Sequence, residues 1–181
     1  MGLKQAPERC DELIDPRGIL VGTAIALIFI LSCPGDSACQ TGLKVGTKFP
    51  EVSLQDLRGN QVTLPGSAEG KIFIAHFWAI WCPYCVGEVA ILQDIEASNS
   101  EKGIICYSIN AGDSAEAAKA YIEKAKATYT VLLDPNFSTS RKIGVKSIPT
   151  TFICDRKGVI RYKILGEVTR KGLDKLLSNI P

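Results

Sequence analysis

Trp81-Cys82-Pro83-Tyr84-Cys85 is the stretch from which the fold can be inferred. It follows the apolar run 72–78 and precedes a segment with the period of a helix, so the two cysteines are predicted to lie where a strand passes into a helix. A helix N-terminus has unpaired backbone N–H groups and the positive end of the helix dipole, which favour a thiolate over a thiol. We therefore expect a reactive pair, with Cys82 at an exposed edge and Cys85 one turn further in.

Cys-x-x-Cys also forms half of many zinc sites, so a metal site is the first alternative. A structural zinc needs a second pair of ligands, but the sequence has no other Cys-x-x-Cys and its one histidine is His76. An inert buried pair is disfavoured as well, because Pro83 suits the first turn of a helix and leaves Cys82 at its edge. The pattern favours a redox pair and predicts neither a metal ion nor a cofactor.

A carboxylate lies on the same predicted helix face as the second cysteine. The helical pattern runs from Pro83 to about Ser98, and Glu88 falls on its apolar stripe directly below Cys85. A partly buried carboxyl group there either has a raised pKa and transfers protons for the inner thiol, or turns away to water. We favour proton transfer, because dithiol exchange needs an acid or base beside the thiol.

Strand and helix patterns alternate through residues 45–181, which predicts one α/β domain. The turn Arg58-Gly59-Asn60 joins two alternating runs as a hairpin, and a second hairpin is predicted around Gly158. The strands are predicted at 49–57, 61–64, 71–78, 104–109, 130–133, 150–153 and 159–164. The helices are predicted at 83–98, 114–126 with Asp113 as its cap, 138–143, and after Thr169, which caps the last one.

A proline precedes the strand predicted after residue 149. Ile148-Pro149 stands before a β-branched and aromatic run, where proline is tolerated, and this peptide bond is a candidate for the cis form. The alternative is that Pro149 only breaks a loop. Cys106 and Cys154 lie inside strand patterns and are predicted to be small core residues without a redox role.

The N-terminal part contains an uncharged apolar segment, residues 18–32. Its length falls between a signal-peptide core and a membrane span. Lys4, Arg9 and Arg17 precede it, and no further Lys or Arg occurs before Lys44. The positive-inside rule therefore predicts a cytoplasmic segment 1–17, a membrane anchor or signal segment 18–32, a linker 33–44, and a domain 45–181 outside the cytoplasm. A buried core helix is disfavoured, because the segment has no polar face.

Cys33 offers a second way to attach the chain to a membrane. Ile30-Leu31-Ser32-Cys33 resembles the lipobox of bacterial lipoproteins, in which the cysteine is lipidated after cleavage. Leu31 is atypical there and acidic residues precede the segment, so we favour an uncleaved anchor with lipidated Cys33 as the alternative; mass spectrometry of the mature N-terminus separates the two. Cys33 and Cys39 are also candidates for a local disulfide.

The charge pattern argues against a nucleic-acid partner. The 181-residue chain has a formal net charge of +2, and its charged residues are interspersed. No basic block is interleaved with aromatic residues, as nucleic-acid binding would favour.

Two motifs together resemble the thioredoxin superfamily, and more narrowly the membrane-anchored TlpA/ResA-like thiol-disulfide oxidoreductases. They are His76-Phe77-Trp78-Ala79-Ile80-Trp81-Cys82-Pro83-Tyr84-Cys85 with Glu88, and Ile148-Pro149-Thr150-Thr151-Phe152-Ile153-Cys154-Asp155 with Lys157-Gly158. The resemblance covers about Val45 to the C-terminus. It implies a thioredoxin-like fold: a central mixed sheet flanked by helices, with an N-terminal hairpin and a helix-strand insertion between Asp113 and Leu133.

The resemblance also implies roles for individual residues. The roles are attack for Cys82, resolution for Cys85, acid–base assistance for Glu88, a cis-proline facing the dithiol for Pro149, and substrate binding for Trp81, Ile148 and Pro149. Three positions depart from the family pattern. Ala90 replaces a frequent proline, His76 stands where thioredoxins have a buried aspartate and this group often an asparagine, and Pro83-Tyr84 is a dipeptide familiar from glutaredoxins.

His76 allows two interpretations at this stage. It either hydrogen-bonds or accepts a proton near the dithiol, or it is a core histidine whose polar atoms are satisfied elsewhere.

The predicted function is extracytoplasmic thiol-disulfide exchange that reduces protein disulfides. The resemblance implies exported proteins such as apocytochrome c as substrates and a membrane thiol reductase as electron donor. Thiol oxidation or disulfide isomerisation on the same fold is the main alternative, because dithiols of this fold span about −270 to −120 mV. A peroxidase is disfavoured, because Ala75 and Ala79 stand where peroxiredoxins have other residues ahead of their cysteine. A non-catalytic binding domain is the last alternative.

Overall fold

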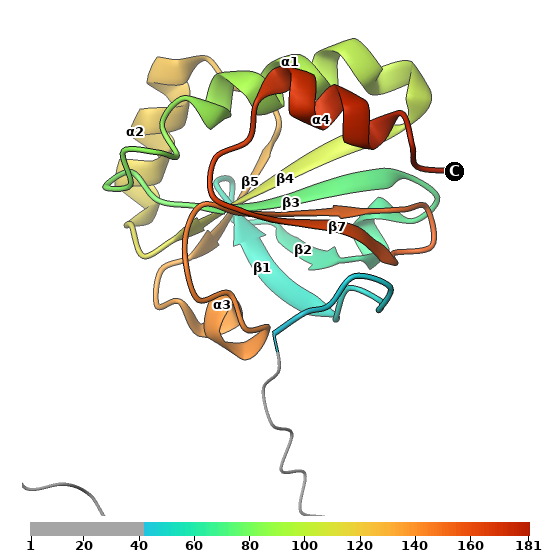
Figure 1. Cartoon of the computed structure of the whole chain (residues 1–181). Helices are drawn as coiled ribbons and strands as arrows, with labels where there is room; N and C mark the ends of the chain where they lie inside the picture. The colour runs from blue at the N-terminus through green and yellow to red at the C-terminus, as the bar shows by residue number, and fades with distance from the viewer. Residues whose placement is uncertain (1–41) are drawn as a thin grey trace, which may run out of the picture. The chain divides into compact units, whose positions relative to one another are not determined.

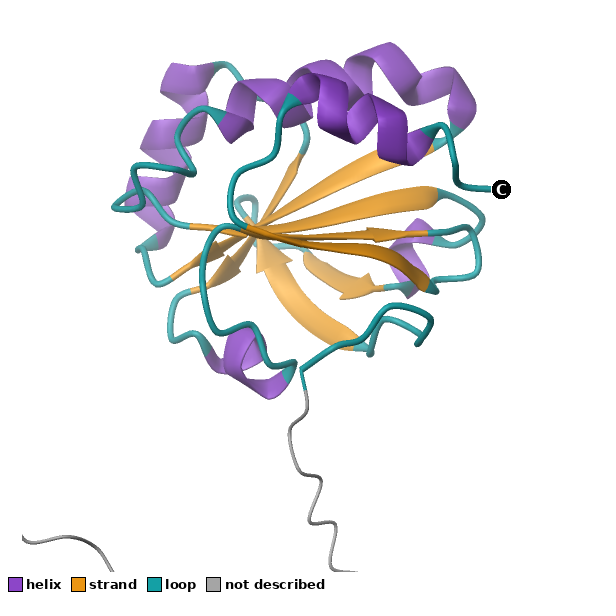
Figure 2. Cartoon of the chain, viewed as in Figure 1, coloured by secondary structure: helices purple, strands orange, loops and turns teal. Residues whose placement is uncertain are grey.

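The computed structural model describes residues 42–181, and within this range it shows one seven-stranded mixed sheet with helices on both faces (Figures 1 and 2). The strand order is β2-β1-β5-β4-β3-β6-β7. The strands are β1 (Val52–Asp56), β2 (Gln61–Leu64), β3 (Ile72–Trp78), β4 (Ile104–Ala111), β5 (Thr130–Asp134), β6 (Thr150–Cys154) and β7 (Ile160–Leu165). The helices are α1 (Glu88–Asn99), α2 (Ala115–Ala125), α3 (Ser138–Lys142) and α4 (Arg170–Leu177).

The interior strand β3 carries the core on both of its faces. It pairs in parallel with β4 and antiparallel with β6, and all seven of its residues are buried. Side chains of a strand alternate between the two faces. Ile72, Ile74 and Trp78 therefore belong to the cluster under α1, α2 and α4, which Figure 1 shows on one side of the sheet.

The opposite face of the sheet is packed mainly by aromatic rings. Phe73 and Phe77 of β3 lie there, and Phe49 contacts Phe73 and Phe152 edge to face with ring centroids 5.5 and 5.9 Å apart. Edge-to-face pairs at this separation stabilise a core beyond their buried area. His76 alternates in step with Ile74 and Trp78, so the strand period places its side chain on the face that α1, α2 and α4 cover.

The predicted N-terminal hairpin is confirmed, and its turn is held by a side chain. β1 and β2 pair antiparallel. Asp56 Oδ1 accepts the backbone N–H groups of Arg58 and Asn60, both at 2.8 Å. Gly59 lies between them with φ +83°, a left-handed conformation that glycine adopts without strain. The parallel crossover from β4 through α2 to β5 and the second hairpin, β6 with β7, are also as predicted.

Two predicted helix starts are wrong. α1 begins at Glu88 rather than Pro83, because Cys85 N–H and Glu88 N–H donate three residues back, to the carbonyls of Cys82 and Cys85. Successive tight turns keep nearly the same apolar spacing as a helix, so the period did not reveal the boundary. At α2 the cap is Ser114, whose hydroxyl accepts the Ala117 N–H, and not Asp113.

The N-terminal predictions lie outside the described residues. These are the cytoplasmic segment 1–17, the anchor 18–32, lipidation of Cys33 and the Cys33–Cys39 disulfide. Among residues 42–181, none of the helices has the length and apolar character to cross a membrane. Leu43, two residues before the predicted start of the domain, already packs against the core and donates its N–H to Ile143.

Candidate active site

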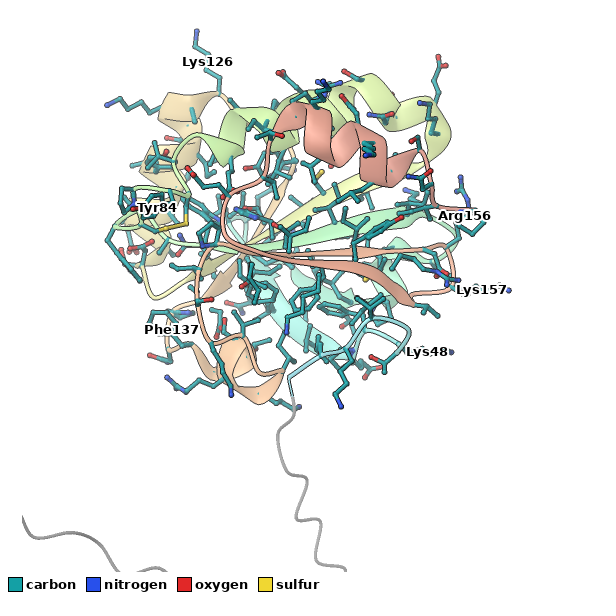
Figure 3. All side chains as sticks on the ribbon, in the orientation of Figure 1. Lys48, Tyr84, Lys126, Phe137, Arg156 and Lys157 are labelled. Carbon is teal, nitrogen blue, oxygen red and sulfur yellow. A yellow bond between two sulfur atoms is a disulfide. The ribbon has the colours of Figure 1, made fainter. Side chains whose placement is uncertain are left out.

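Cys82 and Cys85 form a disulfide in the loop that leaves β3, with their Cα atoms 5.4 Å apart. Both cysteines are buried, with only 3% of Cys82 and none of Cys85 exposed, so the predicted exposure of Cys82 is wrong in this oxidised state. The tight turns before α1 fold the loop onto the core instead of projecting it. The neighbouring side chains are exposed instead: Trp81 is 61% exposed and Tyr84 is 62% exposed. Figure 3 shows Tyr84 at the molecular surface beside the sulfur atoms.

The predicted proline lies at the same end of the sheet as the disulfide loop. β6 pairs with β3 so that Thr150 lies opposite Phe77, which places Pro149 beside the end of β3. The Ile148–Pro149 bond is cis, as predicted. The Pro149 carbonyl accepts the Gly166 N–H at 2.9 Å, whereas within residues 42–181 the backbone of Ile148 has no hydrogen-bond partner. An unpaired backbone beside the dithiol is open to another polypeptide.

Glu88 is buried at the first position of α1, as its place on the apolar stripe indicated. Only 2% of the residue is exposed, and Oε1 accepts the backbone N–H of Val168 at 2.6 Å. The pKa of Glu88 is raised to about 7, mainly by burial; the Val168 N–H opposes this shift, and the nearby charge of Glu167 adds to it. A carboxyl group with this pKa exchanges protons near neutral pH.

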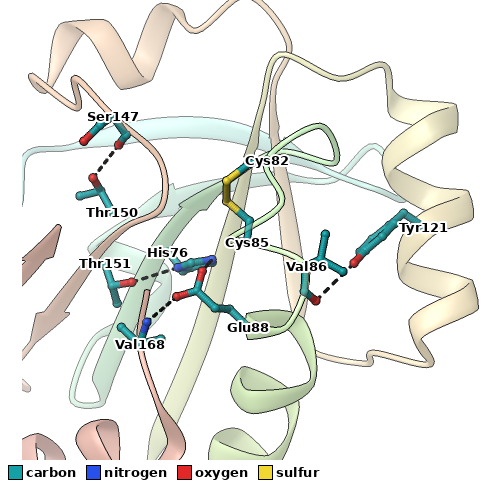
Figure 4. Close-up of polar contacts among 10 residues, drawn as sticks. All are labelled: His76, Cys82, Cys85, Val86, Glu88, Tyr121, Ser147, Thr150, Thr151 and Val168. Atoms are coloured by element: carbon teal, nitrogen blue, oxygen red, sulfur yellow. Dashed lines mark hydrogen bonds and ion pairs between the residues drawn. A yellow bond between two sulfur atoms is a disulfide. The ribbon is translucent and has the colours of Figure 1, made fainter. Parts of the chain in front are cut away.

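His76 lies next to this carboxyl group, between β6 and α1 (Figure 4). Its Nδ1 is 2.9 Å from the hydroxyl oxygen of Thr151, the residue directly opposite it in the sheet. Its Nε2 is 3.4 Å from Oε2 of Glu88. Burial lowers the pKa of His76 to about 3, so the ring is neutral at pH 7. His76 is therefore a core residue, but its Nε2 has no hydrogen-bond partner within the described residues, and its role toward the dithiol stays a prediction.

Two residues hold the disulfide loop in a way that the sequence patterns did not indicate. Asp113 Oδ2 accepts the backbone N–H of Ile80 and the side-chain amide of Asn110, both at 2.8 Å. Tyr121 of α2 donates its hydroxyl to the Val86 carbonyl at 3.3 Å (Figure 4). One signal pointed to Asp113: it follows β4, and the carboxyl ends of parallel neighbours such as β3 and β4 meet at the same sheet edge.

Replacing Asp113 by alanine should loosen the disulfide loop. The N–H of Ile80 and the amide of Asn110 would lose their acceptor, and an unsatisfied buried donor costs about 1–3 kcal/mol. We expect a loss of stability of that order and faster hydrogen exchange at the Ile80 amide. Asp113→Asn, whose side-chain oxygen still accepts a hydrogen bond, is the control and should lose less. Equal stability of the alanine variant and the original protein in urea would contradict the role.

No group of three His, Cys, Asp or Glu side chains that could hold a metal ion occurs among the described residues. The chemistry available at the site is that of the cysteine pair itself: two electrons and two protons exchanged between a dithiol and a disulfide.

The sheet topology, the Cys82–Cys85 pair after the central strand, and the cis-proline at the same sheet edge define a class, the thioredoxin-fold thiol-disulfide oxidoreductases. The model of the AhpC/TSA family matches residues 45–163. The chain belongs to the AhpC/TSA family.

Individual relatives agree with this class. The thiol-disulfide oxidoreductase ResA of Geobacillus kaustophilus is 25% identical over 141 residues, which are 78% of this chain and 80% of that protein. The thioredoxin-like protein YneN of Bacillus subtilis is 28% identical over 161 residues, covering 84% of this chain and 94% of that protein. Among solved structures, a candidate thiol:disulfide interchange protein DsbE from Chlorobium tepidum has a TM-score of 0.71 at 27% identity, covering 76% of this chain and 97% of that chain.

Proposed function

We propose that this protein reduces disulfide bonds of other polypeptides outside the cytoplasm. The observation that carries the proposal is the Cys82–Cys85 pair above a buried carboxyl group with a raised pKa. A redox-active pair needs a group that takes up and releases the proton of the inner thiol, whereas a purely structural disulfide has no use for one.

The proposed cycle begins with the reduced pair. The Cys82 thiolate attacks one sulfur of the substrate disulfide, a mixed disulfide forms, and the other substrate sulfur leaves as a thiolate. Glu88 as a carboxylate then takes the proton of the Cys85 thiol. The Cys85 thiolate attacks Sγ of Cys82, and the second substrate thiolate leaves. Two electrons have passed to the substrate, and the pair ends as the disulfide seen in the structure.

The surroundings of the pair suit an extended polypeptide. The free backbone of Ile148 can pair with a substrate strand, and Pro149 holds that segment at the edge of the site. Trp81, Tyr84 and Val86 are large exposed apolar side chains along the disulfide loop. Exposed apolar residues of this kind gather where a protein partner binds, and they offer more contact area than a small-molecule disulfide substrate would fill.

The location and partners follow from the N-terminal sequence and the family resemblance. An anchor at 18–32 would hold the domain at the outer face of the membrane, with lipidated Cys33 as the alternative. Exported proteins, apocytochrome c among them, would be the substrates. A membrane thiol reductase would return electrons to the pair, because an extracytoplasmic disulfide has no cytosolic reductant.

The reduction potential of the full-length protein tests the direction of transfer. A reductant should equilibrate near about −270 mV, as thioredoxin does, and an oxidase near about −120 mV, as DsbA does. We expect the Cys82–Cys85 couple to lie at the reducing end when titrated against glutathione or dithiothreitol. A value near the oxidising end would overturn reduction and leave thiol oxidation or isomerisation as the function.

A further inference from the structure

Two polar atoms below the disulfide have no hydrogen-bond partner within the described part of the chain. Nε2 of His76 and Oε2 of Glu88 are both fully buried and unsatisfied, and they face each other at 3.4 Å. The other polar atoms of the two side chains are occupied, Nδ1 by Thr151 and Oε1 by Val168. A shift of a few tenths of an ångström would bring Nε2 and Oε2 to hydrogen-bond distance, which buried polar groups strongly favour.

We propose that His76 is a positioning residue whose tautomer changes with the charge of Glu88, so that Nε2 donates to the carboxylate and accepts from the carboxylic acid. This inference rests on the proposed function, because it assigns His76 the task of holding the group that serves Cys85. Figure 4 shows the arrangement that carries it: Thr151, His76 and Glu88 in a row below Cys85.

The two states follow from the hydrogen-bonding abilities of the three side chains. A carboxylate only accepts, so beside it His76 carries its proton on Nε2, and Nδ1 accepts the Thr151 hydroxyl. A carboxylic acid donates its O–H to Nε2, so the ring carries its proton on Nδ1, which donates to the Thr151 oxygen. Thr151 serves both states, because a hydroxyl both donates and accepts, and within the described residues it has no other side-chain bond.

The proton count of the cluster changes by one between these states, while His76 stays neutral in both. The additional proton comes from the Cys85 thiol during resolution and is released to solvent afterwards. The titratable groups that bear on Glu88 are His76 from β3, Glu167 from the segment before α4, and the Cys82–Cys85 pair above it. Of these, His76 lies 3.4 Å from Oε2 and can donate its Nε2–H to it while the ring stays neutral.

The chain contains a single histidine, so the ring nitrogens can be assigned without ambiguity. The experiment is a pH titration of reduced full-length protein, with ¹⁵N shifts of the His76 ring and ¹³C shifts of the Glu88 carboxyl group followed together. We expect the ratio of the Nε2–H to the Nδ1–H tautomer to change by about tenfold or more, which corresponds to one pKa unit. The midpoint of this change should coincide with the midpoint of the Glu88 carboxyl titration. One unchanged tautomer while Glu88 titrates would overturn the proposal.

Three variants separate this coupling from a structural role. In Glu88→Gln the His76 tautomer should no longer depend on pH. Thr151→Val removes the hydroxyl that accommodates both tautomers, so the tautomer ratio of His76 should change less with pH. In His76→Asn the pH midpoint of the exchange rate should move away from that of the original protein. A midpoint unchanged in folded His76→Asn would contradict the proposal.

The control for the proposed function is Cys82→Ala. Full exchange activity without Cys82 would overturn the proposed function itself, whatever the tautomer does. Loss of activity in Cys82→Ala, together with a tautomer that ignores Glu88, would overturn only the role of His76.

Discussion

Cys82→Ala is expected to abolish the reduction of insulin disulfides. The variant lacks the sulfur that attacks the substrate, and Cys85 is fully buried and cannot replace it. Loss of a covalent nucleophile typically lowers the rate by at least about 10³-fold. The measurement is the turbidity of insulin with dithiothreitol as electron source, compared with the rate in dithiothreitol alone.

Two further cysteine variants make this result specific. Cys85→Ala should still attack but not resolve, so it should accumulate a mixed disulfide with the substrate that non-reducing gels detect. Cys154→Ala is the matched control, because this thiol is buried on the opposite face of the sheet and burial keeps its pKa high. Its activity should be unchanged. A fully active Cys82→Ala protein would refute the mechanism.

Glu88→Gln is expected to slow the resolution of the mixed disulfide by about 10²-fold, the lower end of what general acid–base groups contribute. The glutamine oxygen can still accept the Val168 N–H, so the fold should be kept while the proton acceptor for Cys85 is lost. Single-turnover kinetics would show normal formation and slow decay of the mixed disulfide. Glu167→Gln is the control, because it removes a charge near Glu88 but no group that exchanges protons with Cys85. Its resolution rate should stay within a few-fold of that of the original protein, a small effect by comparison.

The same variant should change how stability depends on pH. The folded-state pKa of Glu88 is raised from 4.5 to about 7, so between these values the folded state binds more protons than the unfolded state. Its contribution to stability is therefore greatest below pH 4.5 and declines as the pH rises to about 7, by roughly 3 kcal/mol in all.

Urea unfolding of the oxidised protein at pH 5 and pH 8 measures this effect. Glu88→Gln has no charge to bury, so its stability relative to the original protein should increase between the two pH values. A difference between the two proteins that stays constant from pH 5 to pH 8 would show that the Glu88 carboxyl group is not destabilised by burial.

The parts of the fold that local patterns specify were predictable. Seven consecutive buried residues in β3 required a central strand covered on both sides, and the hairpin of β1 and β2 was marked by its turn at Gly59. Helical spacing placed Glu88 on the buried face below Cys85, and the structure confirms its burial. In each case neighbouring residues along the chain carry the information, because strand and helix periods determine which side chains share a face.

The start of α1 and the burial of Cys82 were not predictable in this way. Successive three-residue turns from Cys82 to Glu88 replace the first turn of the expected helix, and they fold the disulfide against the core. Apolar spacing is nearly the same in tight turns and in a helix, so only the hydrogen bonds distinguish them.

Sequence alone determined the cysteine pair, the acid one turn beyond it, the central strand and the proline at the edge of β6. Only the tertiary structure decided which side chains meet there: His76 with Glu88, Glu88 with Val168, and Asp113 with Ile80. The reason is that a period states which face a residue occupies, whereas its partner depends on strand order and register, which here bring together Glu88 and Val168, 80 positions apart.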